Sequence, residues 1–115
     1  MLSFSGHLRI FVCNQATDMR RSFDGLSALV QGVIQQDPVS GNLYLFRNRG
    51  GDRLKILYWD RDGLAIWYKR LEKGTFELPA GDTASVEITE TEFTLLLGGV
   101  ALDAPRRKRY RLPSS

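Results

Sequence analysis

Apolar residues recur every three or four positions in the first third of the chain, the spacing of a helix that buries one face. This stripe consists of Met19, Phe23, Leu26, Leu29, Val30 and Val33. A side-chain oxygen of Thr17 or Asp18 can cap the first free amides of such a helix. Pro38 ends it, because proline disfavours helical geometry in the residue before it. The pattern therefore predicts one long helix over about 18–35, preceded by a short strand at 8–12.

The middle of the chain reads as strands. Three runs, 42–47, 53–59 and 64–70, are rich in aromatic and branched residues, and loops of hairpin length separate them at 48–52 and 60–63. These runs predict an antiparallel meander. Alternate positions place apolar side chains on both faces, so both faces need a cover. The long helix can cover one face, and the C-terminal helix, a partner protein or nucleic acid can cover the other.

The rest of the chain predicts shorter elements. The runs 75–78 and 85–88 are further possible strands. Thr89 followed three residues later by Glu92 matches a capping box, which opens a short helix that ends at Gly98 and Gly99. The predicted fold class is α+β: an antiparallel β-meander of about four to five strands with one long N-terminal helix (about 18–35) and a short C-terminal helix (about 89–98). We expect one domain over 1–104, followed by a basic, mobile tail over 105–115.

Charge is distributed unevenly along the 115 residues. Residues 1–74 hold 11 Lys and Arg against 7 acids, residues 75–105 hold 6 acids and no Lys or Arg, and residues 106–115 hold 5 basic groups and no acid. Arginine supplies 12 of the 16 cations, and its fork of donors suits phosphate and carboxylate. Cys13 is the only cysteine, which favours a reducing, cytoplasmic location. The N-terminus does not resemble a signal peptide, and its apolar runs are too short to span a bilayer, so no membrane association is expected.

A search for catalytic patterns leaves few candidates. His7 and Cys13 are lone residues of the kind that is usually structural, and no metal or cofactor motif is present, so neither an enzyme nor a cofactor is expected. Asp52, Asp60 and Asp62 lie at the ends of the predicted hairpins. Aspartate favours turns for its own hydrogen bonding, and this interpretation is preferred over a small metal-dependent nuclease, which stays as the last alternative.

Cations interleave with aromatic residues in the meander, as on many nucleic-acid-binding surfaces. The alternative is that the rings fill the core and the cations line its rim, and for Trp59 and Tyr68 the core interpretation is favoured. The hairpin tip between 47 and 53 and the basic tail have no evident structural role. The candidate nucleic-acid-binding residues are Arg47, Arg49, Arg53, Lys55, Lys69, Arg70, Arg106, Arg107, Lys108, Arg109 and Arg111.

Several ordered blocks of the sequence resemble one family. They are Thr17–Leu26 (TDMRRSFDGL), Asp37–Gly41 (DPVSG), Asp52–Leu64 (DRLKILYWDRDGL) and Tyr68–Phe76 (YKRLEKGTF), followed by Pro79. This order is similar to that of the TnpB (Orf2-like) accessory proteins of bacterial insertion sequences of the insertion-sequence-66 family, over about residues 8–100. The resemblance implies a protein encoded beside a separate transposase, which supplies the strand-transfer chemistry, and it supplies no catalytic residues to carry over.

Two functional hypotheses follow. The first is an accessory protein for DNA transposition that binds DNA, either the ends of the element or non-specific duplex, or a transposase–DNA complex. The second is an adaptor that docks on the transposase of the same element through an apolar sheet face, or through its acidic segment, without touching DNA. The sequence does not fix the oligomeric state.

Overall fold

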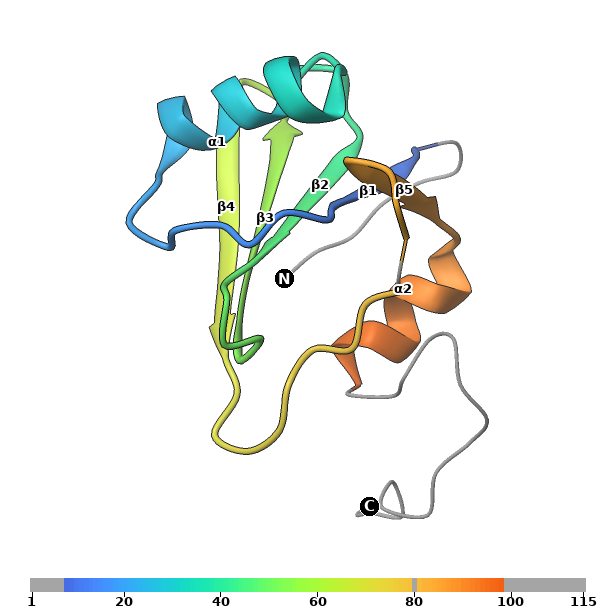
Figure 1. The fold of residues 1–115 in the computed structure, drawn as a ribbon. Coiled ribbons are helices and arrows are strands. Elements are labelled where there is room, and N and C mark those ends of the chain that lie inside the picture. Colours follow the sequence, from blue (N-terminus) through green and yellow to red (C-terminus); the bar gives the residue numbers. More distant parts are fainter. Residues whose placement is uncertain (1–7, 80, 99–115) are drawn as a thin grey trace.

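The protein forms one five-stranded mixed sheet with a helical segment on each face (Figure 1). The structure is a computed structural model, and it describes residues 8–79 and 81–98. The strands lie side by side in the order β4-β3-β2-β1-β5. Their bounds are β1 Ile10–Cys13, β2 Leu43–Arg47, β3 Arg53–Asp60, β4 Gly63–Arg70 and β5 Ser85–Ile88.

The sheet is not the antiparallel meander that the sequence predicts. β2, β3 and β4 do form consecutive antiparallel pairs, with Tyr44 opposite Leu57 and Leu57 opposite Ile66. However, β1 runs parallel to β2, and β5 pairs antiparallel with the other side of β1. The fold-class prediction was wrong at this pair. Parallel strands need a long crossover connection, and the helix between β1 and β2 provides one. The chain therefore begins with a β-α-β unit.

The N-terminal helix was also predicted incorrectly. It is 12 residues long rather than spanning 18–35: α1 covers Phe23–Leu29, and the turn continues as the π-helical segment η1, Val30–Ile34. Its N-cap is Ser22, not Thr17 or Asp18. The segment before it does not join the helix: the Thr17 amide donates to the Arg47 carbonyl at 2.9 Å, and residues 19–20 form a turn in which the Arg21 amide donates to the Asp18 carbonyl at 3.1 Å. The helix stops at Gln35, which adopts a left-handed conformation (φ 62°).

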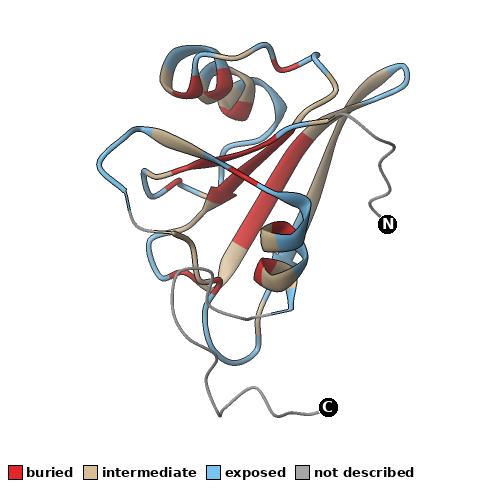
Figure 2. Cartoon of the chain, turned by 90° about the vertical axis from the view of Figure 1, so that its right-hand side faces the viewer, coloured by how far each residue is buried: buried red, intermediate tan, exposed pale blue. Residues whose placement is uncertain are grey.

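Each face of the sheet has its own apolar cluster. The cluster under α1 and η1 contains Phe11, Cys13, Leu26, Val30, Ile34, Tyr44, Phe46 and Leu57. The cluster on the opposite face contains Ile10, Val12, Leu43, Leu45, Leu54, Ile56, Phe76, Ile88, Phe93 and Leu96. Buried residues, red in Figure 2, follow the strands and parts of both helices. Both apolar faces of the sheet are thus covered within the chain itself.

The C-terminal helix α2 (Glu90–Leu97) covers the second face through Phe93 and Leu96. Its predicted capping box is confirmed: Thr89 Oγ1 accepts from the Glu92 amide at 3.1 Å, and Glu92 Oε1 accepts from the Thr89 amide at 2.9 Å. The predicted strand at 75–78 does not form. Phe76 instead inserts its ring into the core, and its amide donates to the Gly51 carbonyl at 2.8 Å. The predicted basic tail lies outside the described residues.

Candidate nucleic-acid interface

The candidate site lies where the two parallel strands end. β1 and β2 run in the same direction, so the segment after Cys13 and the hairpin tip after Arg47 emerge at the same edge of the sheet. The hydrogen bond from the Thr17 amide to the Arg47 carbonyl joins these two segments directly. In open α/β sheets, ligands bind beyond the carboxyl ends of the parallel strands.

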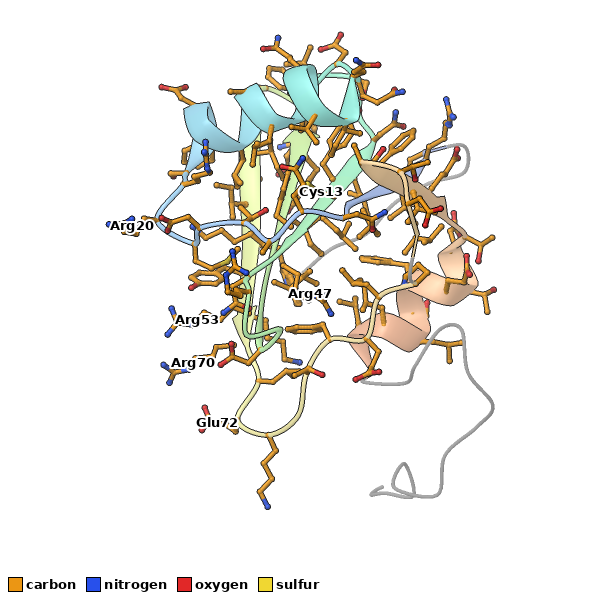
Figure 3. The ribbon with its side chains drawn as sticks, in the orientation of Figure 1. Cys13, Arg20, Arg47, Arg53, Arg70 and Glu72 are labelled. Atoms are coloured by element: carbon orange, nitrogen blue, oxygen red, sulfur yellow. The ribbon has the colours of Figure 1, made fainter. Side chains whose placement is uncertain are left out.

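A groove of about 580 Å³ lies between these segments and β4. Its lining includes the guanidinium-bearing residues Arg20, Arg49 and Arg53, together with Asp18 and Tyr68. We call these five residues and the space between them the arginine groove. In Figure 3, Arg20 and Arg53 lie along one side of the molecule with Arg70 below them. The three arginines of the groove come from three separate segments: the loop before α1, the hairpin tip and β3.

The hairpin tip that presents Arg49 is held by its neighbour Asn48. The Asn48 amide nitrogen Nδ2 donates to Asp52 Oδ1 at 2.9 Å, and Asn48 Oδ1 accepts from the Arg53 amide at 3.0 Å. The first contact lowers the pKa of the Asp52 carboxyl, with smaller contributions from nearby arginines. Gly51 is required in the same turn because its φ is 79° and a Cβ there would lie 3.2 Å from Thr75. The tip is therefore a fixed scaffold beneath the exposed Arg49 side chain.

Arg20 is oriented by Asp18. The Arg20 guanidinium donates to both carboxylate oxygens, with Nη2 2.6 Å from Oδ2, and the Arg20 amide donates to Oδ1 at 2.9 Å. Hydrogen bonding from Arg20, more than its charge alone, lowers the pKa of Asp18 to about 2. The Arg20 side chain is nevertheless 91% exposed. The pair thus orients an exposed guanidinium at the groove wall, and the Asp18 carboxylate partly neutralises its charge.

Tyr68 lines the groove, and its register partner Lys55 lies beside it on the helix-facing side of the sheet. Lys55 is 8% exposed, and its Nζ donates to the Met19 and Arg21 carbonyls at 2.8 Å each. The same Nζ lies 4.8 Å from the centroid of the Tyr68 ring. Arg53 Nη1 donates to the Tyr68 hydroxyl at 3.3 Å. Tyr68 is 47% exposed, which differs from the core position favoured for it on sequence grounds.

The structure brings only some of the predicted binding residues together. Arg49 and Arg53 line the groove, and Arg70 lies beside Arg53 because the two are register partners. Lys69 is exposed but pairs with Leu54, so it projects from the opposite face. Arg47 donates to the Phe76 carbonyl at 2.7 Å, and the Lys55 ammonium is committed to backbone carbonyls. Arg106, Arg107, Lys108, Arg109 and Arg111 lie outside the described residues.

Sequence reasoning missed Arg20. It was assigned to the predicted helix, where it would have been one more surface cation. The signal that could have found it is the strand–helix–strand order of residues 10–47, because a parallel first pair brings the loop before the helix to the hairpin tip.

The aspartates considered for a metal site do not meet. Asp52 precedes β3, whereas Asp60 and Asp62 lie at the other end of that strand. Within residues 8–79 and 81–98, no three His, Cys, Asp or Glu side chains are placed to hold a metal ion. Cys13 is buried in the core, and this burial raises the pKa of its thiol.

Comparison with known proteins identifies the family. The family model described as IS66 Orf2 like protein matches residues 8–107. The chain belongs to this family. Membership of the IS66 Orf2-like family indicates an accessory role in transposition and agrees with the resemblance noted in the sequence.

Two relatives of this IS66 Orf2-like protein come from Sinorhizobium fredii (strain NBRC 101917 / NGR234), and both are named as uncharacterized proteins. The protein y4jC is 36% identical over 114 residues, covering 99% of this chain and 97% of its own. The protein y4hO is 34% identical over 100 residues, covering 87% of each chain. No solved structure matches the chain. Among the described residues, no helix is long and apolar enough to cross a membrane.

Proposed function

We propose that this protein assists transposition of its insertion element by binding DNA through the arginine groove. The observation that supports this most directly is that three arginines from separate segments line one hollow. Arginine side chains bind phosphate through paired donors, and the release of counterions from DNA drives such binding. The protein acts in the cytoplasm on the DNA of its own element, and the separate transposase supplies the chemistry.

The charge balance of the groove supports an anionic ligand. Its lining holds three arginines against one aspartate, and Arg53 has a second cation beside it in Arg70. Arg70 has only a loose ion pair with Glu72, at 3.9 Å between side chains that are 60% and 88% exposed. Exposed pairs at this distance are worth little, so Arg70 stays able to contact phosphate. Figure 3 shows Arg20, Arg53 and Arg70 following one side of the molecule.

We assign different roles to the other candidate cations. Arg47 and Lys55 have structural roles rather than DNA contacts, because Arg47 Nη1 and Lys55 Nζ already donate to backbone carbonyls. Lys69 projects from the opposite face of the sheet and is not assigned to the groove. A complex with the transposase remains part of the proposal, and α2 packs on the second sheet face through Phe93 and Leu96.

The test is duplex binding as a function of salt. Fluorescence anisotropy with a labelled duplex is measured over a series of salt concentrations for the wild type and for R49A/R53A. Each phosphate contact contributes about 0.9 to the slope of log affinity against log salt, so the double variant should lose about 2 units of slope.

Arg61→Ala is the matched control. It removes one exposed arginine from the far end of the β3–β4 hairpin and should leave the slope unchanged. Replacing the five basic residues of the tail by Ala measures the contribution of the tail separately. Duplex binding with the same slope in the wild type and in R49A/R53A would refute the groove as the DNA contact. An adaptor without DNA contact would show no duplex binding and would copurify with the transposase after nuclease treatment.

A further inference from the structure

Tyr68 is an aromatic side chain fixed in place and left open to solvent. Lys55 Nζ lies over its ring at 4.8 Å from the centroid, and its hydroxyl accepts a hydrogen bond from Arg53. Despite these two contacts, 47% of the residue is exposed, and it lines the arginine groove. An exposed aromatic ring that is already ordered loses little side-chain entropy when a ligand stacks on it.

The dimensions of the groove suit a small group. Its volume of about 580 Å³ falls within the range of small-molecule sites, roughly 300–1,000 Å³. In a duplex the bases are stacked and paired. Its phosphates can contact the arginines of the groove, but its bases cannot reach Tyr68. An unpaired base can be splayed out, enter the hollow and stack on an aromatic side chain.

Arg53 lies next to both the aromatic ring that would stack on a base and the arginines that would bind phosphate. Its Nη1 donates to the Tyr68 hydroxyl at 3.3 Å, and Arg53 lines the same groove as Arg20 and Arg49. A base against the Tyr68 ring therefore lies beside cations that can bind the phosphates of its own nucleotide and of the next. Aromatic rings beside cations along a strand are the combination with which proteins hold single-stranded nucleic acid.

We propose that the arginine groove is a single-strand site, in which one unpaired nucleotide stacks its base on Tyr68 and places its phosphates against Arg20, Arg49 and Arg53. This inference rests on the proposed function and specifies the form of nucleic acid. The duplex contacts only the rim arginines, whereas an unpaired strand also reaches the tyrosine.

The experiment compares three labelled ligands of equal length by fluorescence anisotropy: oligodeoxythymidylate, an abasic strand with the same phosphates, and a duplex. Wild-type protein should bind oligodeoxythymidylate about tenfold or more tightly than the abasic strand, because stacking supplies the difference. Tyr68→Leu should remove that preference, whereas Tyr68→Phe, which keeps the ring, should retain it. Oligouridylate, run in parallel, determines whether the site also accepts RNA.

The outcomes separate this inference from the proposed function. Salt-dependent duplex binding without any preference for the base-bearing strand would overturn the single-strand site and leave the proposed function standing. Absence of binding to all three ligands would refute both the single-strand site and the proposed function. Photo-crosslinking of wild-type protein to a strand carrying 5-iododeoxyuridine tests the contact without a variant: mass spectrometry should place the crosslink on Tyr68, and crosslinks confined to other residues would overturn the assignment.

Discussion

The ammonium group of Lys55 lies 2.8 Å from the carbonyl oxygen of Met19 and donates a hydrogen bond to it. A second bond of the same length reaches the Arg21 carbonyl. Lys55 thereby holds the segment before α1 against the helix-facing side of the sheet, and this segment forms one wall of the arginine groove. Lys55, a candidate phosphate ligand on sequence grounds, thus positions one wall of the arginine groove.

Lys55→Met should destabilise the protein. The substitution keeps much of the aliphatic stem but leaves two carbonyl oxygens without their donor in a partly buried position. Loss of such bonds typically costs about 1–3 kcal/mol in the free energy of unfolding. Urea unfolding followed by circular dichroism measures the change. Lys69→Met is the matched control, because this exposed lysine on the same sheet should change stability by less than about 0.5 kcal/mol. Equal effects of the two substitutions would contradict the structural role of Lys55.

Asp18→Asn should strengthen DNA binding. The carboxylate of Asp18 neutralises Arg20 at the groove wall, and the amide keeps the shape while removing the negative charge. The variant should bind duplex several-fold more tightly at low salt, with a steeper dependence on salt. Asp82→Asn, which removes an exposed acid before β5, supplies the comparison at equal net charge. If both variants gain equally, the effect is one of overall charge and not of the groove.

The Asp18–Arg20 pair also predicts a pH dependence. The folded-state pKa of Asp18 lies at about 2, below its ordinary value of 3.8, mainly because Arg20 donates hydrogen bonds to it. A lowered carboxyl pKa stabilises the fold above the ordinary value, and this contribution is lost as pH falls toward 2. Carbon-detected NMR of the side-chain carboxyl should follow this titration. In Arg20→Ala the pKa should return toward its ordinary value, and an unchanged midpoint would show that Arg20 is not the cause.

Thr89→Ala should weaken the attachment of α2. The Thr89 hydroxyl accepts from the Glu92 amide, and the reciprocal bond from the Thr89 amide to Glu92 completes the capping box. Removing an N-cap side chain costs about 1 kcal/mol in typical cases. Thr91→Ala, at an exposed position in the first turn of the same helix, is the control and should have a smaller effect. Thermal unfolding of the two variants side by side measures the difference.

The parts of the fold that depend on neighbouring residues could be predicted from the sequence. The hairpins through β2, β3 and β4 follow from alternation and turn residues, and the capping box at Thr89 is a pattern of four residues. The pairing of β1 could not be predicted in this way, since both of its partners are distant in sequence. The start of the helix was misplaced because Thr17 and Asp18 have capping side chains, yet the Thr17 amide donates to the Arg47 carbonyl and the helix begins only at Phe23.

The candidate site was predicted in part for the same reason. Arg49 and Arg53 lie at a hairpin tip that can be recognised locally, and the structure places both in the groove. Arg20 joins them only through the parallel pairing of β1 with β2. Lys55 alternates with apolar residues as a surface lysine would, and nothing in the local pattern shows that its ammonium meets two carbonyl oxygens from the loop before α1.

β1 pairs with β5, a strand that is synthesised near the end of the chain. Ile10 is opposite Ile88, so a nascent chain leaving the ribosome has its first strand long before it has that strand's outer neighbour. Until then the outer edge of β1 offers open backbone groups, and such edges invite pairing with other chains. Fragments that stop short of residue 85 keep this edge open permanently and are expected to aggregate, whereas chains cut after Gly98 retain both β5 and α2.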